Sequence, residues 1–365
     1  MADKIDPSTQ LPLQLRRGRG ALSNPSARFA EHSQELFDDA WGSLAELPNT
    51  LPTTLHIDSA KSVITYNESP DVPFDRSINP YRGCEHGCTY CFARPTHAYL
   101  GLSPGLDFET QLFYKPDAAD LLREELRARR YRPAPIALGI NTDAYQPVER
   151  QLGLTRKILQ VLAEAQHPVS IVTKSALIER DLDILGPMAA NGLAQVAISI
   201  TTLKPELSRQ LEPRAAAPKR RLQTLEQLTA AGVPTTVLLA PLIPMLNDEE
   251  LEKILTQCRA AGAVDAGYVL LRLPHELKDL FAEWLHTHVP LKADRILQRI
   301  YEAHGGKAYN AAFGQRMTGT GTYADLLRQR FQLAKKKLVF PGEPPFNIAL
   351  FRPPQPLKGQ LDLFW

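Results

Sequence analysis

The sequence predicts an α/β fold: a partial (β/α)6 TIM-like barrel with additional C-terminal helices. Two observations carry this prediction. Short runs of apolar and β-branched residues recur along the middle of the chain, and stretches with the helical i, i+3, i+4 spacing of apolar residues separate them. Six units that alternate in this way favour an α/β barrel, either closed or open.

The expected strands are apolar along most of their length, which is typical of strands buried on both faces of a parallel sheet. They cover residues 76–81, 136–140, 169–173, 195–201, 235–240 and 268–271. The clearest helix between them is marked by Leu251, Ile254, Leu255 and Cys258, which follow the pattern of a single helix face. Two earlier stripes predict helices in the same way, and they consist of Leu154, Ile158 and Leu162, and of Leu222, Leu225 and Leu228.

Two more apolar stripes follow the last expected strand, so we expect helices to close one side of the barrel. They consist of Leu277, Leu280, Phe281, Trp284 and Leu285, and of Tyr323, Leu326, Leu327 and Phe331. The chain is thus expected to contain a largely irregular N-terminal arm (1–60), the barrel (61–275), a helical extension (276–340) and a proline-rich tail (341–365).

Composition and charge exclude several classes of protein. With 44% hydrophobic and 22% charged residues, the chain is neither collagen-like, disordered nor a coiled coil. A net charge of +2 excludes wholesale electrostatic adhesion to nucleic acid, but it allows a local basic arm at Arg16, Arg17 and Arg19. The start lacks a secretory apolar segment, and the longest apolar run, 237–246, is too short to span a bilayer. We expect a cytoplasmic protein without a membrane partner.

Three of the four cysteines, Cys84, Cys88 and Cys91, lie within eight positions. Cysteines that cluster in a reduced compartment usually bind metal or carry out chemistry. Thiolates suit zinc or an iron–sulfur cluster, and a four-iron cluster normally takes four cysteines. The fourth, Cys258, lies far away on an apolar helix stripe and is expected to be a buried hydrophobic residue. A cluster held by three thiolates leaves one iron open, as a catalytic site requires.

The alternative is a zinc site in which His86 or His97 completes the ligand set. However, the C-x3-C-x2-C spacing, with Tyr90 just before the last cysteine, resembles the radical S-adenosylmethionine (SAM) superfamily. The resemblance implies that the loop follows the first strand of a partial barrel and holds a [4Fe-4S] cluster. It also implies that SAM binds the open iron, that an electron from a donor such as flavodoxin or ferredoxin cleaves it, and that the resulting 5′-deoxyadenosyl radical abstracts hydrogen from substrate.

The resemblance also nominates residues for SAM binding, because barrel sites lie at the carboxyl ends of strands. These candidates are Tyr90, Asn141, Thr142, Asp143, Lys174, Ser199, Thr201 and Arg214. The alternatives are that Lys174 and Arg214 face solvent and that the hydroxyls of Ser199 and Thr201 bond to neighbouring backbone.

Segments 141–149, 172–174 and 212–214 resemble the branch of the superfamily that contains spore photoproduct lyase, which reverses a thymine dimer in DNA. That lyase carries a hydrogen-donating cysteine near the end of its second strand, and this chain has none there. The chain is therefore expected to belong to a sister group that does not repair dimers by the same mechanism.

The C-terminus resembles the pentapeptide by which bacterial DNA polymerases and repair proteins dock on the sliding clamp. It consists of Gln360, Leu361, Asp362, Leu363 and Phe364. The apolar side chains would fill pockets and the glutamine would supply polar bonds, as in other short docking peptides. The alternative is a tail that folds back on the barrel.

The leading hypothesis is a radical SAM enzyme that acts on DNA and binds the clamp. The alternatives are a radical SAM enzyme for RNA, protein or a small molecule with no clamp role, and a non-catalytic zinc-binding module.

Overall fold

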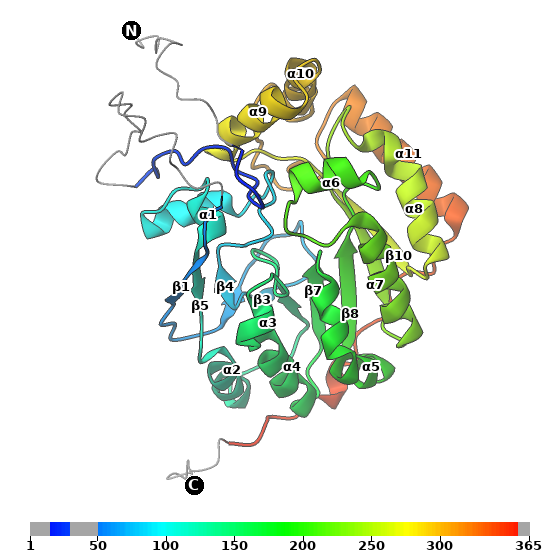
Figure 1. Cartoon of the computed structure of the whole chain (residues 1–365). Coiled ribbons are helices and arrows are strands. Elements are labelled where there is room, and N and C mark those ends of the chain that lie inside the picture. Colours follow the sequence, from blue (N-terminus) through cyan, green and yellow to red (C-terminus); the bar gives the residue numbers. More distant parts are fainter. Residues whose placement is uncertain (1–14, 30–49, 357–365) are drawn as a thin grey trace.

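The computed structural model describes residues 15–29 and 50–356, and within them the main sheet has seven strands in the order β10-β9-β8-β7-β6-β3-β2 (Figure 1). They are β2 (Ile64–Tyr66), β3 (Arg76–Ile78), β6 (Ile136–Leu138), β7 (Val169–Thr173), β8 (Ala194–Ser199), β9 (Thr235–Leu242) and β10 (Asp265–Leu270). All neighbours from β3 to β10 pair in parallel, whereas β2 pairs antiparallel with β3 at the edge. The six consecutive parallel strands confirm the partial (β/α)6 barrel.

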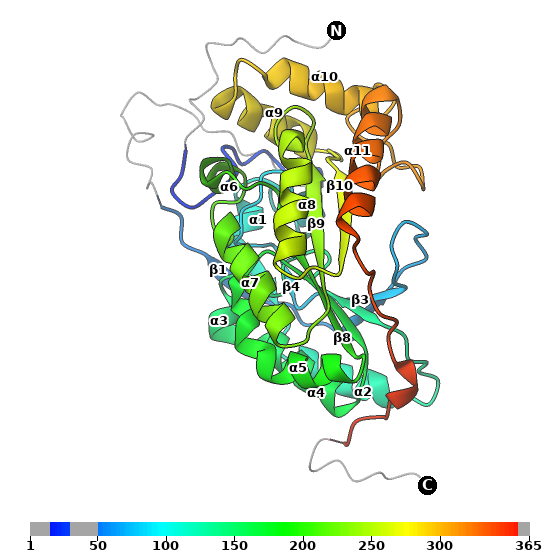
Figure 2. The ribbon, with the colours of Figure 1, turned by 90° about the vertical axis from the view of Figure 1, so that its right-hand side faces the viewer.

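Helices connect these strands and cover the outer face of the sheet (Figures 1 and 2). They are α2 (Ala118–Arg127), α3 (Glu149–Leu152), α4 (Leu154–Glu164), α5 (Leu182–Ala190), α6 (Pro205–Leu211), α7 (Pro218–Ala230) and α8 (Leu251–Ala260), together with the short 3-10 helices η3 (Ala176–Asp181) and η4 (Asp248–Glu250). The main hydrophobic core lies between helices and sheet and includes Leu162, Ile171 and Leu225. Cys258 of α8 is fully buried in this core, as expected of a small apolar residue.

A small second sheet, not expected from the sequence, lies beside the barrel. Its strands, in the order β1-β5-β4, are β1 (Thr54–Ile57), β5 (Gln111–Tyr114) and β4 (Tyr81–Arg82). The 3-10 helix η2 (Arg94–Leu100) and helix α1 (Asp107–Thr110) lie between β4 and β5 along the chain. Because β4 directly precedes the cysteines, this sheet fixes the start of the cysteine loop.

Three helices follow the barrel: α9 (Leu277–His288), α10 (Ala293–Ala303) and α11 (Thr322–Leu338). The stripe on α9 is confirmed, because Phe281 and Trp284 are buried in a second hydrophobic cluster. On α11 the prediction was wrong for Leu326, which is 49% exposed, because α11 buries the face that carries Leu327 and Phe331. Among the described helices, none combines the length and the hydropathy that a bilayer crossing requires.

The described part of the tail crosses the amino ends of the barrel strands (Figure 2). The amides of Gly342, Asn347 and Arg352 donate to Val264 O (2.8 Å), Gly192 O (2.9 Å) and Ala165 O (2.9 Å), which shortly precede β10, β8 and β7. The last 3-10 helix, η5 (Ile348–Leu350), lies within this segment. The described tail thus lies on the face opposite the carboxyl ends of the strands. The pentapeptide 360–364 lies outside the described residues.

Candidate functional site

The cysteine loop joins β4 to η2 at the carboxyl end of β3. Cys84 and Cys88 are buried and Cys91 is partly exposed. Tight turns connect them, with Gly87 N donating to Cys84 O (3.4 Å) and Cys91 N to Cys88 O (3.3 Å). Burial raises the pKa of the Cys88 thiol to about 12 and also raises the pKa of Cys84 and Cys91. Since the thiolate is the metal ligand, a metal must displace these protons when it binds.

Two glycines let the loop bend where no side chain fits. Gly83 and Gly87 have φ of +79° and +67°, in the left-handed region that glycine tolerates. A Cβ on Gly87 would lie 2.9 Å from Glu109 Oε2, and a Cβ on Gly83 would lie 2.6 Å from a Leu112 methyl group. The loop is therefore closely packed on α1 and β5.

A segment from the N-terminal arm, residues 15–29, packs on the outside of this loop, and we call it the strap. Gly20 is so close to the loop that an added Cβ would lie 1.9 Å from Gly87 O. The amides of Gly20 and Ala21 each donate to the carboxylate of Glu109 at 2.9 Å. Glu109 also pairs with Arg94, and both side chains are at most 1% exposed.

Arg94 carries the connection back to the cysteines, because its Nε donates to Cys88 O at 2.8 Å. The strap, Glu109, Arg94 and Cys88 are thus linked by one chain of buried polar contacts. Arg19 does not form part of an exposed basic arm, which the sequence analysis allowed. It is 7% exposed and donates to Glu109 O (2.7 Å) and Thr53 Oγ1 (3.0 Å). Arg19 holds the strap in place instead of facing a phosphate backbone.

A polar network joins the loop to the carboxyl ends of β7 and β8. Lys174 Nζ donates to Ser199 Oγ (2.9 Å) and lies 5.8 Å from the centre of the Tyr90 ring. The backbone amide of Lys174 donates to Asp143 Oδ2 (2.8 Å), and Tyr90 OH lies 3.3 Å from Thr201 Oγ1. The structure therefore brings together five of the eight SAM-binding candidates.

Two residues of this network, Glu212 and Arg221, were not predicted. Glu212 accepts from Tyr90 OH and from Thr201 Oγ1 (2.7 Å), and it pairs with Arg221, whose Nη1 donates to Ser199 O (3.0 Å). Burial alone would raise the pKa of Glu212, but Arg221 and Lys174 lower it to about 2. The helical period offered a signal, because Arg221 precedes Leu225 by four positions on the buried face of α7.

Asp143 connects the second strand to the same network. It accepts from Thr173 Oγ1 (2.7 Å), and its Oδ2 lies 3.3 Å from His86 Nδ1. Burial alone would raise the pKa of Asp143, but His86 and the hydrogen bonds lower it to about 2. The zinc alternative gains no support here, because His86 faces Asp143 and His97 Nε2 bonds to Gln111 O (2.9 Å). The remaining donor set is three thiols on one loop, which suits a cluster with three cysteine ligands.

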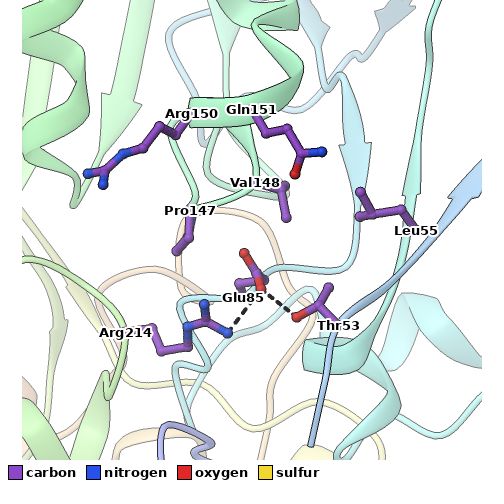
Figure 3. A pocket seen from close by; sticks show the side chains of 8 residues that line it. All are labelled: Thr53, Leu55, Glu85, Pro147, Val148, Arg150, Gln151 and Arg214. Atoms are coloured by element: carbon purple, nitrogen blue, oxygen red, sulfur yellow. Dashed lines mark hydrogen bonds and ion pairs between the residues drawn. The ribbon is translucent and has the colours of Figure 1, made fainter.

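The other three SAM-binding candidates lie apart from the network. Asn141 is exposed and its amide donates to Asn79 Oδ1 (2.9 Å), whereas Thr142 is buried and donates to Tyr81 O (2.9 Å). Arg214 lies in a cavity of about 400 Å³, where it pairs with Glu85 at 2.9 Å. Figure 3 shows this cavity, with Thr53 bonding to the same carboxylate and with Pro147, Val148, Arg150, Gln151 and Leu55 around it.

Comparison with known proteins agrees with this geometry. The family model of the radical SAM superfamily matches residues 78–258, which contain the cysteine loop and most of the barrel. The uncharacterised protein Rv2578c of Mycobacterium tuberculosis is 40% identical over 307 residues, covering 81% of this chain and 86% of its own length. The uncharacterised protein MJ0683 of Methanocaldococcus jannaschii is 28% identical over 173 residues, covering 47% of this chain and 62% of its own length.

Among solved structures, a spore photoproduct lyase mutant with bound AdoMet and dinucleoside spore photoproduct has a TM-score of 0.57 at 14% identity, covering 80% of this chain and 81% of the lyase. At this identity the likeness shows the fold. The chain belongs to the radical SAM superfamily. It is an enzyme of that class, its cofactors are a [4Fe-4S] cluster and SAM, and it needs a reductant to generate the 5′-deoxyadenosyl radical.

Proposed function

We propose that this radical SAM enzyme acts on DNA as a repair or lesion-processing enzyme. The observation that carries the proposal is the extent of the likeness to spore photoproduct lyase, which covers 80% of this chain and reaches beyond the matched residues 78–258. One of those lyase structures holds both AdoMet and a dinucleoside photoproduct. A shared fold alone does not fix a substrate, so the proposal also draws on the site and the tail.

In this proposal Cys84, Cys88 and Cys91 hold the cluster, because they are the three thiols on the loop. Lys174 and Ser199 bind SAM from the carboxyl ends of β7 and β8, where barrel sites lie. The ammonium group of Lys174 can pair with a carboxylate. The Ser199 hydroxyl donates to Ala240 O (3.0 Å), so it can only accept a further hydrogen bond from the ligand. When bound, the cluster and SAM supply the radical that abstracts hydrogen from the substrate.

The expected hydrogen transfer differs from that of the lyase. The cysteines of this chain are residues 84, 88, 91 and 258, so none follows β6 as a hydrogen donor. Cys258 is fully buried in the apolar core and does not face the barrel mouth. The hydrogen donor for the product must therefore be another group, and we propose lesion processing instead of dimer reversal by a cysteine.

The tail supports a location at the replication clamp. The described tail ends at the amino face of the barrel, where Gln355 N donates to Glu164 Oε1 at 2.9 Å. The pentapeptide 360–364 follows within a few residues, so its docking on the clamp leaves the carboxyl face of the barrel available to DNA. A tether of this kind raises the local concentration of enzyme near replicating DNA.

The experiment is anaerobic reduction of the reconstituted full-length enzyme with SAM and ultraviolet-irradiated DNA, followed by digestion and mass analysis of the nucleosides. We expect a change in nucleoside composition that requires SAM and is absent in Cys88→Ala. The matched control is Cys258→Ala, which should retain the change because Cys258 lies on the buried face of α8, in the main hydrophobic core. Formation of 5′-deoxyadenosine without any change in the DNA would overturn the DNA proposal and favour RNA, protein or a small molecule as substrate.

A further inference from the structure

A second cavity, of about 540 Å³, opens beside the cysteine loop, and we call it the β3–β6 pocket. Asn79 and Tyr81 follow β3, and Asn141 and Thr142 follow β6, so the pocket lies at the carboxyl ends of two barrel strands. Its volume falls within the range of about 300–1,000 Å³ that is typical of ligand sites. Neither the cysteines nor the Lys174–Ser199 network lines it.

The lining of the β3–β6 pocket is basic. Its described lining residues include Lys61, Arg82 and Lys115 but no carboxylate. Behind the wall, Asp58 accepts from both Arg82 Nε (2.9 Å) and Lys115 Nζ (3.0 Å) and is 15% exposed. Asp58 thus faces two cations, and Lys61 adds a third, exposed cation to the lining. A second carboxylate, that of Glu125, accepts from the amide of the lining residue Val63 (2.5 Å), so three cations stand against two carboxylates. The local excess of positive charge favours an anionic ligand.

The remaining lining suits a nucleotide. The hydroxyl groups of Ser62 and Thr65 can donate to phosphate or sugar oxygens. At the rim, Tyr99 is 71% exposed and stacks on Phe29, with ring centroids 5.3 Å apart. Exposed aromatic rings beside cations are the usual platform for unpaired bases of a single strand.

We propose that the β3–β6 pocket binds a phosphate group of a nucleic-acid strand while Tyr99 stacks against an adjacent base. This inference rests on the proposed function and deepens it, because it assigns a binding site to the DNA. The pocket adjoins the centre of the reaction: Arg82 lies two residues before Cys84, and Thr142 precedes Asp143, which bonds to Lys174 N. A strand held here lies next to the cysteine loop.

The test is fluorescence anisotropy of a labelled single-stranded DNA oligonucleotide with the full-length protein over a series of salt concentrations. Lys61→Glu should weaken binding at least tenfold, and Lys61→Ala should reduce the slope of log affinity against log salt by about 1. Tyr99→Ala should weaken binding about ten- to a hundredfold, as expected for a lost stacking contact. The matched control is Lys337→Glu, which makes the same charge change on an exposed residue at the end of α11.

Equal affinities for the wild type, Lys61→Glu and Tyr99→Ala would overturn the inference, and so would an equal loss in Lys337→Glu and Lys61→Glu. Unchanged melting temperatures show that the variants are folded. The proposed function fails separately. If Lys61→Glu and Tyr99→Ala weaken DNA binding as expected but no SAM-dependent change in the DNA is found, the binding site is supported and the proposed function is overturned. Tighter binding of an RNA oligonucleotide through the same residues supports the pocket and assigns it to RNA.

Discussion

The buried Glu109 carboxylate gives a prediction whose size follows from its contacts. In Glu109→Gln the side chain keeps its shape but loses its charge, so Arg94 remains buried without a counter-ion. The new amide group also points a donor toward the amides of Gly20 or Ala21, which donated to the carboxylate. Removing one partner of a buried ion pair typically costs about 3–5 kcal/mol, and we expect a loss of unfolding free energy in that range.

The assay is denaturant unfolding of wild type and variant, together with hydrogen exchange of peptides that cover residues 15–29. The amides of Gly20 and Ala21 should exchange much faster in the variant. The matched control is Glu249→Gln, which removes the same charge from the pair with Lys204, where the side chains are 52% and 65% exposed. An exposed pair is worth at most about 1 kcal/mol, so this control should unfold almost like the wild type.

Gly20→Ala tests the same contact from the strap, because its Cβ would meet Gly87 O at 1.9 Å. We expect the strap to detach and the iron content after reconstitution to fall, since the Cys84–Cys88 turn loses its support. The reasoning is refuted if Glu109→Gln costs no more than Glu249→Gln and if Gly20→Ala retains both protected amides and full iron content.

Three other predictions concern other features. Burial lowers the pKa of His167 to about 4 from an unfolded value of about 6.5, so the neutral side chain stabilises the fold fully above pH 6.5, and the free energy of unfolding should fall by about 3 kcal/mol as the pH falls toward 4. His167→Gln should flatten this part of a pH series of unfolding free energies, and an unchanged slope would contradict the assignment. Ser199→Ala should weaken SAM binding about tenfold in calorimetry. Arg214→Gln should change the affinity for SAM little, because Arg214 pairs with Glu85. An equal loss of SAM affinity in both variants would place Arg214 in the SAM site. Deletion of residues 360–365 should abolish clamp binding in surface plasmon resonance and leave the melting temperature unchanged, whereas a lower melting temperature without clamp binding by the wild type would mean that the tail packs on the barrel.

The barrel could be predicted because most of its strands are largely buried and therefore largely apolar. Strand β8, for example, is buried at all its positions, and the sequence there is almost continuously apolar. Strands β1 and β4 gave no comparable signal, since β1 has no buried residue and only one of the two residues of β4 is buried. Helix α5 was also missed, because Pro187 lies inside it and proline normally argues against a helix interior.

The cysteine triplet was visible because its members lie within eight positions. The contacts that support it were not visible, since Glu109 meets Gly20 across 89 positions and nothing local marks either residue. The different placement of Arg214 and Arg221 shows the same limit. Both follow β8, but only the start of α7 turns Arg221 toward Glu212, whereas Arg214 turns toward Glu85.

Iron content and SAM cleavage in the cysteine variants test the central claim most directly. The full-length protein is reconstituted anaerobically with iron and sulfide, reduced in the presence of SAM, and assayed for bound iron, for the electron paramagnetic resonance signal of the reduced cluster and for 5′-deoxyadenosine. We expect one cluster and 5′-deoxyadenosine in the wild type and in Cys258→Ala, and neither in Cys84→Ala, Cys88→Ala or Cys91→Ala. Full iron content and SAM cleavage in any of these three variants would contradict the assignment of the cysteine loop as the centre of this radical SAM enzyme.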